Sequence, residues 1–188
     1  MVALTALWLP VLVAGAVVFF ASSIIHMFLP YHRKDFGGLP EEDKVMEALR
    51  GVDVPPGDYV MPYAGGDPQV MKSDEFRAKV EAGPVAFMTV LPKNDPMAMG
   101  PQLMQWFVYC VVVSVFAAYV TSRALGPGAE YLSVHRFAGV TAFAAYGLAL
   151  AQRSIWFHQS WTTTFKSMFD ALVYGMLTGG IFGWLWPS

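Results

Sequence analysis

The chain has 188 residues, of which 55% are hydrophobic and 14% are charged, and its formal net charge is −2. Soluble domains carry about a quarter of charged residues, so this composition argues against a soluble globular domain and favours membrane spans joined by polar segments. The net charge and the lack of a basic stripe argue against a nucleic-acid partner, and the single cysteine, Cys110, excludes an intrachain disulfide.

Residues 4–29 form the first of four apolar segments that are long enough to cross a membrane, which takes about 20 helical residues. A cleaved signal peptide is the competing interpretation, but this segment lacks a positively charged start and its apolar run is longer than is usual in such peptides. We therefore expect a retained membrane anchor. The other three segments cover residues 103–121, 134–157 and 165–186.

The polar segment between the first two spans, residues 30–101, holds twelve of the fourteen acidic residues and ten of the thirteen prolines. Helix start and stop signals predict one helix over residues 39–50 and a second over residues 73–82. Strand-like residues at 58–63 and 85–91 could pair into a small ribbon. These elements make a small core, so we expect the segment to be ordered by packing on the spans or on a partner.

The expected fold is an all-α membrane protein: a four-helix transmembrane bundle with a small α+β polar insertion between spans one and two. Its parts are the first transmembrane helix (1–29), the polar insertion (30–101) and a three-helix transmembrane region (102–188). Cations near the span ends are more numerous on the side of the insertion, which the positive-inside rule places in the cytoplasm. Those on the side of the insertion are Arg33, Lys34, Lys93, Arg153 and Lys166, and those on the other side are Arg123 and Arg136.

The fourth span carries small residues at every fourth position. They are Ala171, Gly175, Gly179 and Gly183. Residues at this spacing share one helix face, and small ones let another backbone approach closely. The face could pack against the small residues of the third span within the bundle, or it could associate with another chain.

Asp170 is the one acidic residue inside an apolar span, where a carboxylate is costly and needs a partner. Arg153 lies about as far before the turn between spans three and four as Asp170 lies after it. The sequence therefore predicts an intramembrane ion pair between Arg153 and Asp170, with Lys166 as the alternative partner. Such a pair could lock the hairpin of spans, or it could relay protons or ions.

The four histidines raise the question of a haem or a metal. Among them, only His26 and His158 lie on the same side and could face each other across the bundle as haem ligands. No metal-ligand spacing supports a metal site, and no phosphate loop, nucleophile elbow or zinc-protease motif is present. We expect no catalytic residue, no metal site and no cofactor.

The stretch His-Met-Phe-Leu-Pro-Tyr-His-Arg-Lys-Asp at residues 26–35 and the Leu-Pro-Glu-Glu-Asp at 39–43 resemble the start of a family of small, uncharacterised bacterial inner-membrane proteins with four spans. The ending Phe-Gly-Trp-Leu-Trp-Pro at 182–187 is similar to theirs as well. The resemblance covers most of the chain. It implies a multi-pass protein of the bacterial inner membrane, and it implies no function, cofactor or site residue.

The function expected from these features is that of a structural or accessory subunit, which packs against itself or against a larger membrane complex. The small-residue faces and the absence of chemical motifs favour this interpretation. A small ion- or proton-coupled transporter or channel, acting as an oligomer, is the first alternative. A haem-binding membrane protein is the second. The expected partners are the lipid bilayer and either a second copy of the chain or a larger membrane complex.

Overall fold

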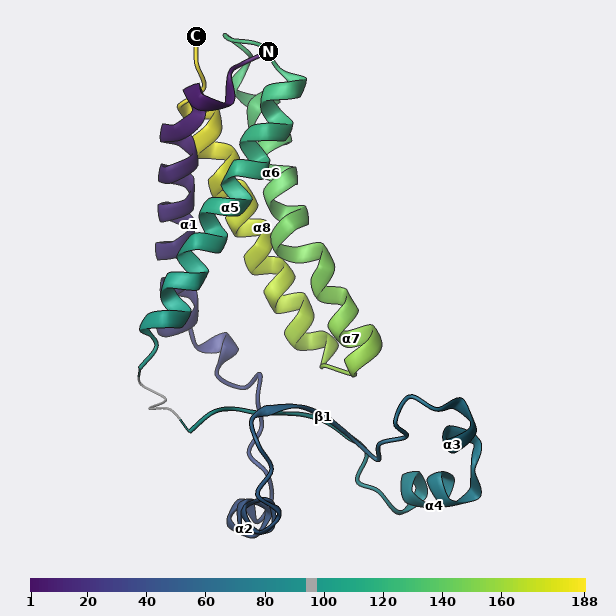
Figure 1. Cartoon of the computed structure of the whole chain (residues 1–188). Coiled ribbons are helices and arrows are strands. Elements are labelled where there is room, and N and C mark those ends of the chain that lie inside the picture. The colour runs from purple at the N-terminus through teal and green to yellow at the C-terminus, as the bar shows by residue number, and fades with distance from the viewer. Residues whose placement is uncertain (94–97) are drawn as a thin grey trace. The chain divides into compact units, whose positions relative to one another are not determined.

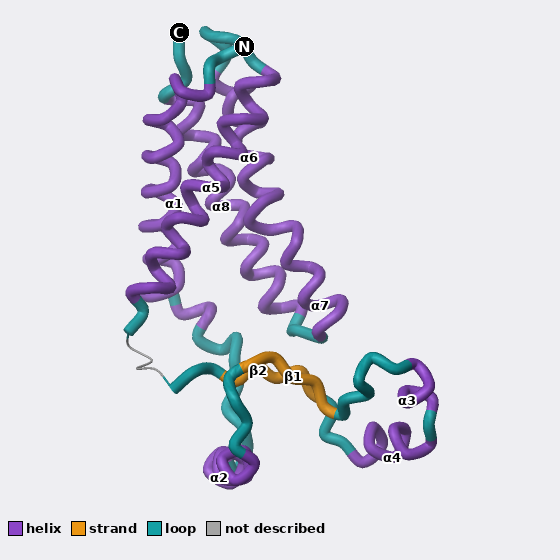
Figure 2. The backbone as a smooth tube through the Cα atoms, viewed as in Figure 1, coloured by secondary structure: helices purple, strands orange, loops and turns teal. Residues whose placement is uncertain are grey.

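The computed structural model describes residues 1–93 and 98–188 (Figure 1). The chain is mostly helical, and the described part contains one small two-stranded sheet (Figure 2). It divides into two compact units, which are treated separately below. The first unit comprises Met1–Phe36 and Met99–Ser188, and the second comprises Gly37–Ala98.

Three helical segments of the first unit are long and apolar enough to span a membrane: Leu4–Phe28, Gly100–Ala124 and Tyr131–Phe157. The prediction of apolar helices long enough to cross a membrane is thereby confirmed for three of the four predicted segments, which are called spanning segments below. The fourth segment forms a helix of 24 residues, α8 (Trp161–Trp184), that is not among them. Lys166 and Asp170 within α8 lower its mean hydropathy.

The first two spanning segments contain the long helices α1 (Trp8–Phe28), which follows a short 3-10 turn, and α5 (Gly100–Ala124). The third spanning segment is not one continuous helix. It consists of α6 (Tyr131–Gly147), the 3-10 turn η3 (Leu148–Leu150) and α7 (Ala151–Phe157). The break follows Gly147, where a Cβ atom would lie 2.8 Å from the Cβ of Ala171 in α8.

Helices α6 and α8 pack closely because glycines face each other across the contact. A Cβ atom on Gly175 would lie 2.8 Å from the Gly139 carbonyl oxygen, and one on Gly179 would lie 2.6 Å from the His135 carbonyl oxygen. Real Cβ atoms do not approach backbone so closely, so these positions require glycine. The small-residue face of α8 is therefore occupied by a helix of the same chain.

Both termini lie at one end of this helix bundle (Figure 1). There the Gly128 amide donates a hydrogen bond to the Pro187 carbonyl (2.8 Å), and the Trp186 indole donates one to the Gly126 carbonyl (2.9 Å). The opposite end holds the last turn of α1, the start of α5 and the turn between α7 and α8. At that end, α7 and the start of α8 lie away from α1 and α5 (Figure 1).

The second unit contains three short helices and the predicted ribbon. The helices are α2 (Glu42–Val52), α3 (Pro68–Lys72) and α4 (Asp74–Ala82). Strands β1 (Gly57–Met61) and β2 (Ala86–Val90) pair in antiparallel register. In its described part, 37–93 and residue 98, no residue is buried, so the unit lacks a core of its own.

Candidate functional site

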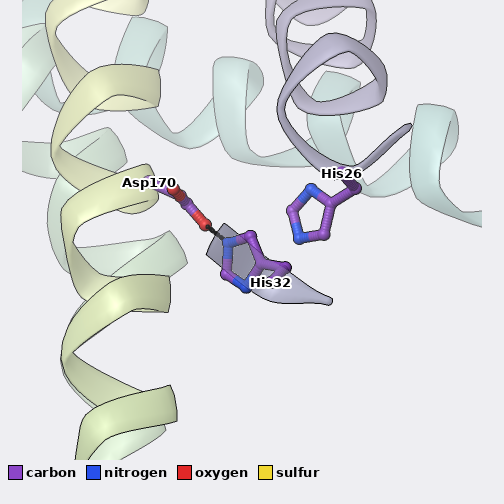
Figure 3. A group of neighbouring side chains, drawn as sticks. All are labelled: His26, His32 and Asp170. Atoms are coloured by element: carbon purple, nitrogen blue, oxygen red, sulfur yellow. Dashed lines mark hydrogen bonds and ion pairs between the residues drawn. The ribbon is translucent and has the colours of Figure 1, made fainter. Parts of the chain in front are cut away.

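The carboxylate of Asp170 is buried in the first unit, and two groups from the turn after α1 bind it. This turn includes the 3-10 segment η2 (Pro30–His32). The Tyr31 hydroxyl donates a hydrogen bond to Oδ1 of Asp170, and His32 Nε2 lies 2.7 Å from Oδ2 (Figure 3). Asp170 is only 2% exposed. It lies nine residues after the start of α8, a distance of about 14 Å along the helix.

A second acid–base contact extends this arrangement. His32 Nδ1 lies 2.5 Å from Oδ2 of Asp35, and Lys166 Nζ donates hydrogen bonds to Oδ1 of Asp35 and to the Tyr31 carbonyl, each at 2.6 Å. We call Tyr31, His32, Asp35, Lys166 and Asp170 the polar cluster. Its two carboxylates balance one lysine and one histidine, so the cluster is neutral when His32 is protonated.

The contacts of His32 indicate that its ring is protonated. An ionised carboxylate only accepts hydrogen bonds, so each ring nitrogen must carry a hydrogen to bind Asp35 and Asp170 at once. Burial works against this charge, but the hydrogen bonds to Asp35 and Asp170 outweigh it and raise the pKa of His32 above its usual value. His32 is thus held as an imidazolium between two carboxylates.

The neighbouring groups respond to the same contacts. The hydrogen bond from Lys166, aided by the one from His32, lowers the pKa of the Asp35 carboxyl despite its burial. Burial and the hydrogen bond to Asp170 raise the pKa of the Tyr31 phenol. Asp35 is therefore ionised and Tyr31 neutral at physiological pH, which matches the donor and acceptor roles that the geometry assigns to them.

The structure gives Asp170 different partners from those predicted from the sequence. Within the described chain, no ion pair joins Asp170 to Arg153 or to Lys166. Arg153 is exposed in α7, and its carbonyl oxygen accepts the backbone N–H of His158. The prediction rested on equal distances from the turn, but Arg153 lies in α7, after the break at η3, and Asp170 binds the turn after α1. Lys166 instead binds Asp35.

A cavity of about 510 Å³ lies beside the polar cluster, lined by residues of α1, α5, the end of α6, η3 and α8. Its lining is mostly apolar and aromatic, and Asp170 and His26 are among its few ionisable groups. The lining residues are Ser22, Ser23, His26, Met27, Met99, Gln102, Leu103, Trp106, Tyr109, Tyr146, Leu150, Ser167, Asp170 and Tyr174.

Four aromatic rings form one wall of this cavity. The Trp106 ring lies 5.5 Å from Tyr109, 6.0 Å from Tyr146 and 6.3 Å from Tyr174, measured between centroids. Tyr146 and Tyr174 meet edge to face at 5.4 Å. The Trp106 indole N–H donates a hydrogen bond to the Ser22 hydroxyl (2.6 Å), which fixes the ring against α1. Such a wall of edges and faces suits a flat aromatic ligand.

A metal ion is the other occupant to consider, because His26, His32 and Asp170 place three potential ligand atoms within 4.8 Å of one another. The two imidazole rings are stacked, with centroids 4.6 Å apart and planes 9° apart (Figure 3). A metal binds in the plane of an imidazole, and both nitrogens of His32 already bind carboxylates. The side chains as they lie form a hydrogen-bond network rather than a coordination sphere.

The two histidines that the sequence proposed as haem ligands have other surroundings in the structure. His26 stacks on His32, and its Nδ1 lies 3.0 Å from the Ser22 carbonyl oxygen. His158 is exposed and caps the end of α7 in a left-handed backbone conformation, with φ of 54°.

Sequence reasoning missed the role of the turn after α1, although a signal was present. Along α8, Lys166, Asp170 and Tyr174 recur every fourth residue and share one helix face. That face needs polar partners, and Tyr31 and His32 lie directly after an apolar span. Searching the span ends for groups complementary to this polar stripe could have identified them.

No protein-family model, curated protein or solved structure matches this chain. Its function has to be inferred from the geometry and chemistry of the site itself.

Proposed function

We propose that the chain is an integral membrane protein of four spans that binds a small lipid-soluble molecule in the cavity beside the polar cluster. The observation that carries this proposal is the cavity, with its volume of about 510 Å³ and its aromatic wall. Sites for small molecules are typically hollows of about 300–1,000 Å³ with an apolar lining and a few polar groups. Both the size and the lining fit this description.

The side chains at the rim of the cavity favour a ligand that enters from the bilayer rather than from water. Met27, Met99 and Leu103 line the cavity, and they are 69%, 54% and 40% exposed. These apolar side chains lie at the ends of α1 and α5, helices that are apolar enough to span a membrane. In a bilayer their exposed surface faces lipid, so an apolar molecule reaches the cavity without crossing water.

The contacts of α8 support a fourth span despite its two charged residues. An unpaired charge in the hydrocarbon region is costly, but a paired and hydrogen-bonded one is tolerated. Lys166 is paired with Asp35 and Asp170 with His32. Glycines hold α6 and α8 in close contact, so an α6 that crosses the membrane favours an α8 that crosses beside it.

Cysteine labelling in intact cells tests the four spans and the topology. The native Cys110 is fully buried, so we expect little background labelling from it. With four spans, Ala3→Cys and Ser188→Cys are labelled from the same side of the membrane and Lys93→Cys from the other. If α8 does not cross, Ser188→Cys is labelled from the same side as Lys93→Cys.

The same experiment tests the proposed location. In a bacterial inner membrane, the excess of Lys and Arg near the insertion places residues 30–101 in the cytoplasm. A membrane-impermeant reagent added outside the cell membrane should then label the two terminal variants and leave Lys93→Cys unlabelled. Labelling of Lys93→Cys alone would reverse the proposed orientation.

Extraction of bound compounds tests the binding function. We expect the protein purified in mild detergent to yield one compound at about one per chain on extraction with organic solvent, identified by mass spectrometry. Leu103→Trp fills the rim of the cavity and should abolish its retention. Val112→Trp is a matched control on α5, exposed but outside the cavity lining. Equal compound recovery from both variants would overturn the proposal.

An accessory subunit is a second candidate, and the second unit favours it. The described part of Gly37–Ala98 has no buried residue, yet α2 exposes Val45, Met46 and Val52. A segment with this little core is usually completed by another surface. Met46→Glu should then abolish co-purification of a stoichiometric partner, identified by mass spectrometry, whereas Glu47→Gln should not. Recovery of the chain alone at native expression level would contradict this candidate.

The remaining two alternatives have lost the features that suggested them. A transporter was inferred from a pair between Arg153 and Asp170, and Asp170 has other partners. Haem binding was inferred from His26 facing His158, and His26 stacks on His32 instead. We therefore propose neither.

A further inference from the structure

The hydroxyl of Tyr174 is a buried polar group of the cavity lining that lacks a hydrogen-bond partner among the described residues. Tyr174 is 4% exposed and lines the cavity, and its hydroxyl oxygen is buried with no hydrogen-bond partner among the described residues. A buried hydroxyl without a partner lowers stability, so such groups are rare unless a ligand or water completes them. Of the other tyrosines in the lining, Tyr109 donates to the Ala145 carbonyl at 3.0 Å.

The missing partner is a hydrogen-bond acceptor. A phenol donates its proton readily, and the ring of Tyr174 is held edge to face against Tyr146 and near Trp106. An acceptor bound to this hydroxyl would lie beside the aromatic wall. A carbonyl oxygen attached to a flat ring can do so while the ring itself packs against Trp106.

The charge balance of the neighbouring cluster selects a neutral ligand. Aromatic rings beside a carboxylate often bind an organic cation, and Asp170 does line the cavity. However, both of its oxygens are already engaged, Oδ1 by Tyr31 and Oδ2 by His32. A cation would leave the site with an uncompensated positive charge in an apolar setting.

We propose that the cavity binds the ring of a membrane quinone, with the Tyr174 hydroxyl donating a hydrogen bond to a ring carbonyl oxygen. This inference rests on the proposed function, because it names the class of molecule that the same cavity takes. A neutral ring leaves the charges of the polar cluster balanced, and its carbonyl oxygen can accept a hydrogen bond from the Tyr174 hydroxyl. The apolar tail of such a quinone can lie against the exposed rim of Met27, Met99 and Leu103.

Titration of the purified full-length protein in detergent with a short-chain benzoquinone, followed by calorimetry, tests this inference. Tyr174→Phe removes only the hydroxyl and should weaken binding about threefold to tenfold, the equivalent of one neutral hydrogen bond. Tyr119→Phe on the outer surface of α5, outside the cavity lining, should bind like the wild type. The ligand-free Tyr174→Phe protein should be at least as stable as the wild type, since it loses an unpartnered group.

The other outcomes separate the two proposals. Quinone binding that is unchanged in Tyr174→Phe would overturn the role of this hydroxyl. Tetraphenylphosphonium is a lipophilic cation that carries phenyl rings. If it binds more tightly than the quinone, the inference that the ligand is neutral would be overturned. Failure of the quinone to bind, together with extraction of a different compound from the wild type but not from Leu103→Trp, would overturn the quinone and leave the binding function in place.

Discussion

Replacing Asp170 with alanine is the most direct test of how the polar cluster holds the bundle together. The substitution removes the acceptor of the Tyr31 hydroxyl and one of the two carboxylates that bind His32. Asp35 remains on the other ring nitrogen of His32. The cluster then changes from neutral to a charge of +1 while staying largely buried.

The expected loss follows from these contacts. Removing one partner of a buried ion pair costs about 3–5 kcal/mol, because the other charge is left uncompensated. His32 keeps Asp35 and is 11% exposed through its side chain, so water and the second carboxylate reduce the penalty. We therefore expect the free energy of unfolding to fall by about 3 kcal/mol for Asp170→Ala. Asp170→Asn keeps the shape and one acceptor, and it should cost about 2 kcal/mol.

The measurement is equilibrium unfolding in mixed micelles by titration with sodium dodecyl sulfate, followed by tryptophan fluorescence at pH 6. Glu130→Ala is the control, because Glu130 is exposed and makes no side-chain cap at the start of α6. A double-mutant cycle with His32→Ala should give a coupling energy of about 0.5–3 kcal/mol. A loss for Asp170→Ala no larger than that for Glu130→Ala would refute the structural role of the cluster.

Two further predictions concern pH and helix packing. Because folding raises the pKa of His32 above 6.5 and lowers that of Asp35 below 3.8, stability should be constant between these values. It should fall as pH rises through the folded value of His32 and as pH drops through that of Asp35, and His32→Gln should remove the alkaline decline in the same unfolding assay. Gly179→Ala would place a Cβ 2.6 Å from the His135 carbonyl oxygen and should cost about 1–3 kcal/mol. The adjacent Gly180→Ala meets only the tip of a side chain at 3.6 Å and should leave the unfolding midpoint near wild type; equal losses would contradict the packing argument.

Much of the helical fold was predictable because apolar length and helix signals are local properties of the sequence. The second strand was predicted over residues 85–91 and observed over Ala86–Val90, because its β-branched and aromatic residues and flanking turn residues are adjacent in the chain. The break at η3 was not predicted. It depends on Gly147, where a Cβ would lie 2.8 Å from the Cβ of Ala171, so the glycine is needed by a contact with α8 and not by any local pattern.

The candidate site was predictable only in part. Asp170 was singled out because a carboxylate in an apolar span needs a partner. Its partners, Tyr31 and His32, are separated from it by 139 and 138 residues. The polar stripe on α8 indicates that partners are needed, but no local signal reports which residues supply them at that separation. The cavity was also not predictable, since its lining comes from α1, α5, α6, η3 and α8, which are distant in the sequence.

The two kinds of contact made by α8 explain how the fold and the candidate site depend on each other. Its small residues, such as Gly175 and Gly179, fix α8 against α6, while Asp170 and Tyr174 lie on the adjacent face, toward the turn after α1 and the cavity. Tyr174 follows Asp170 by one helical turn, so the contacts that position Asp170 also position the hydroxyl that we assign to the quinone. Asp170→Asn should therefore weaken quinone binding as well as stability, although Asp170 has no free oxygen for the ligand. If quinone affinity stays at the wild-type level while stability falls, the cluster secures the turn after α1 without setting the position of Tyr174.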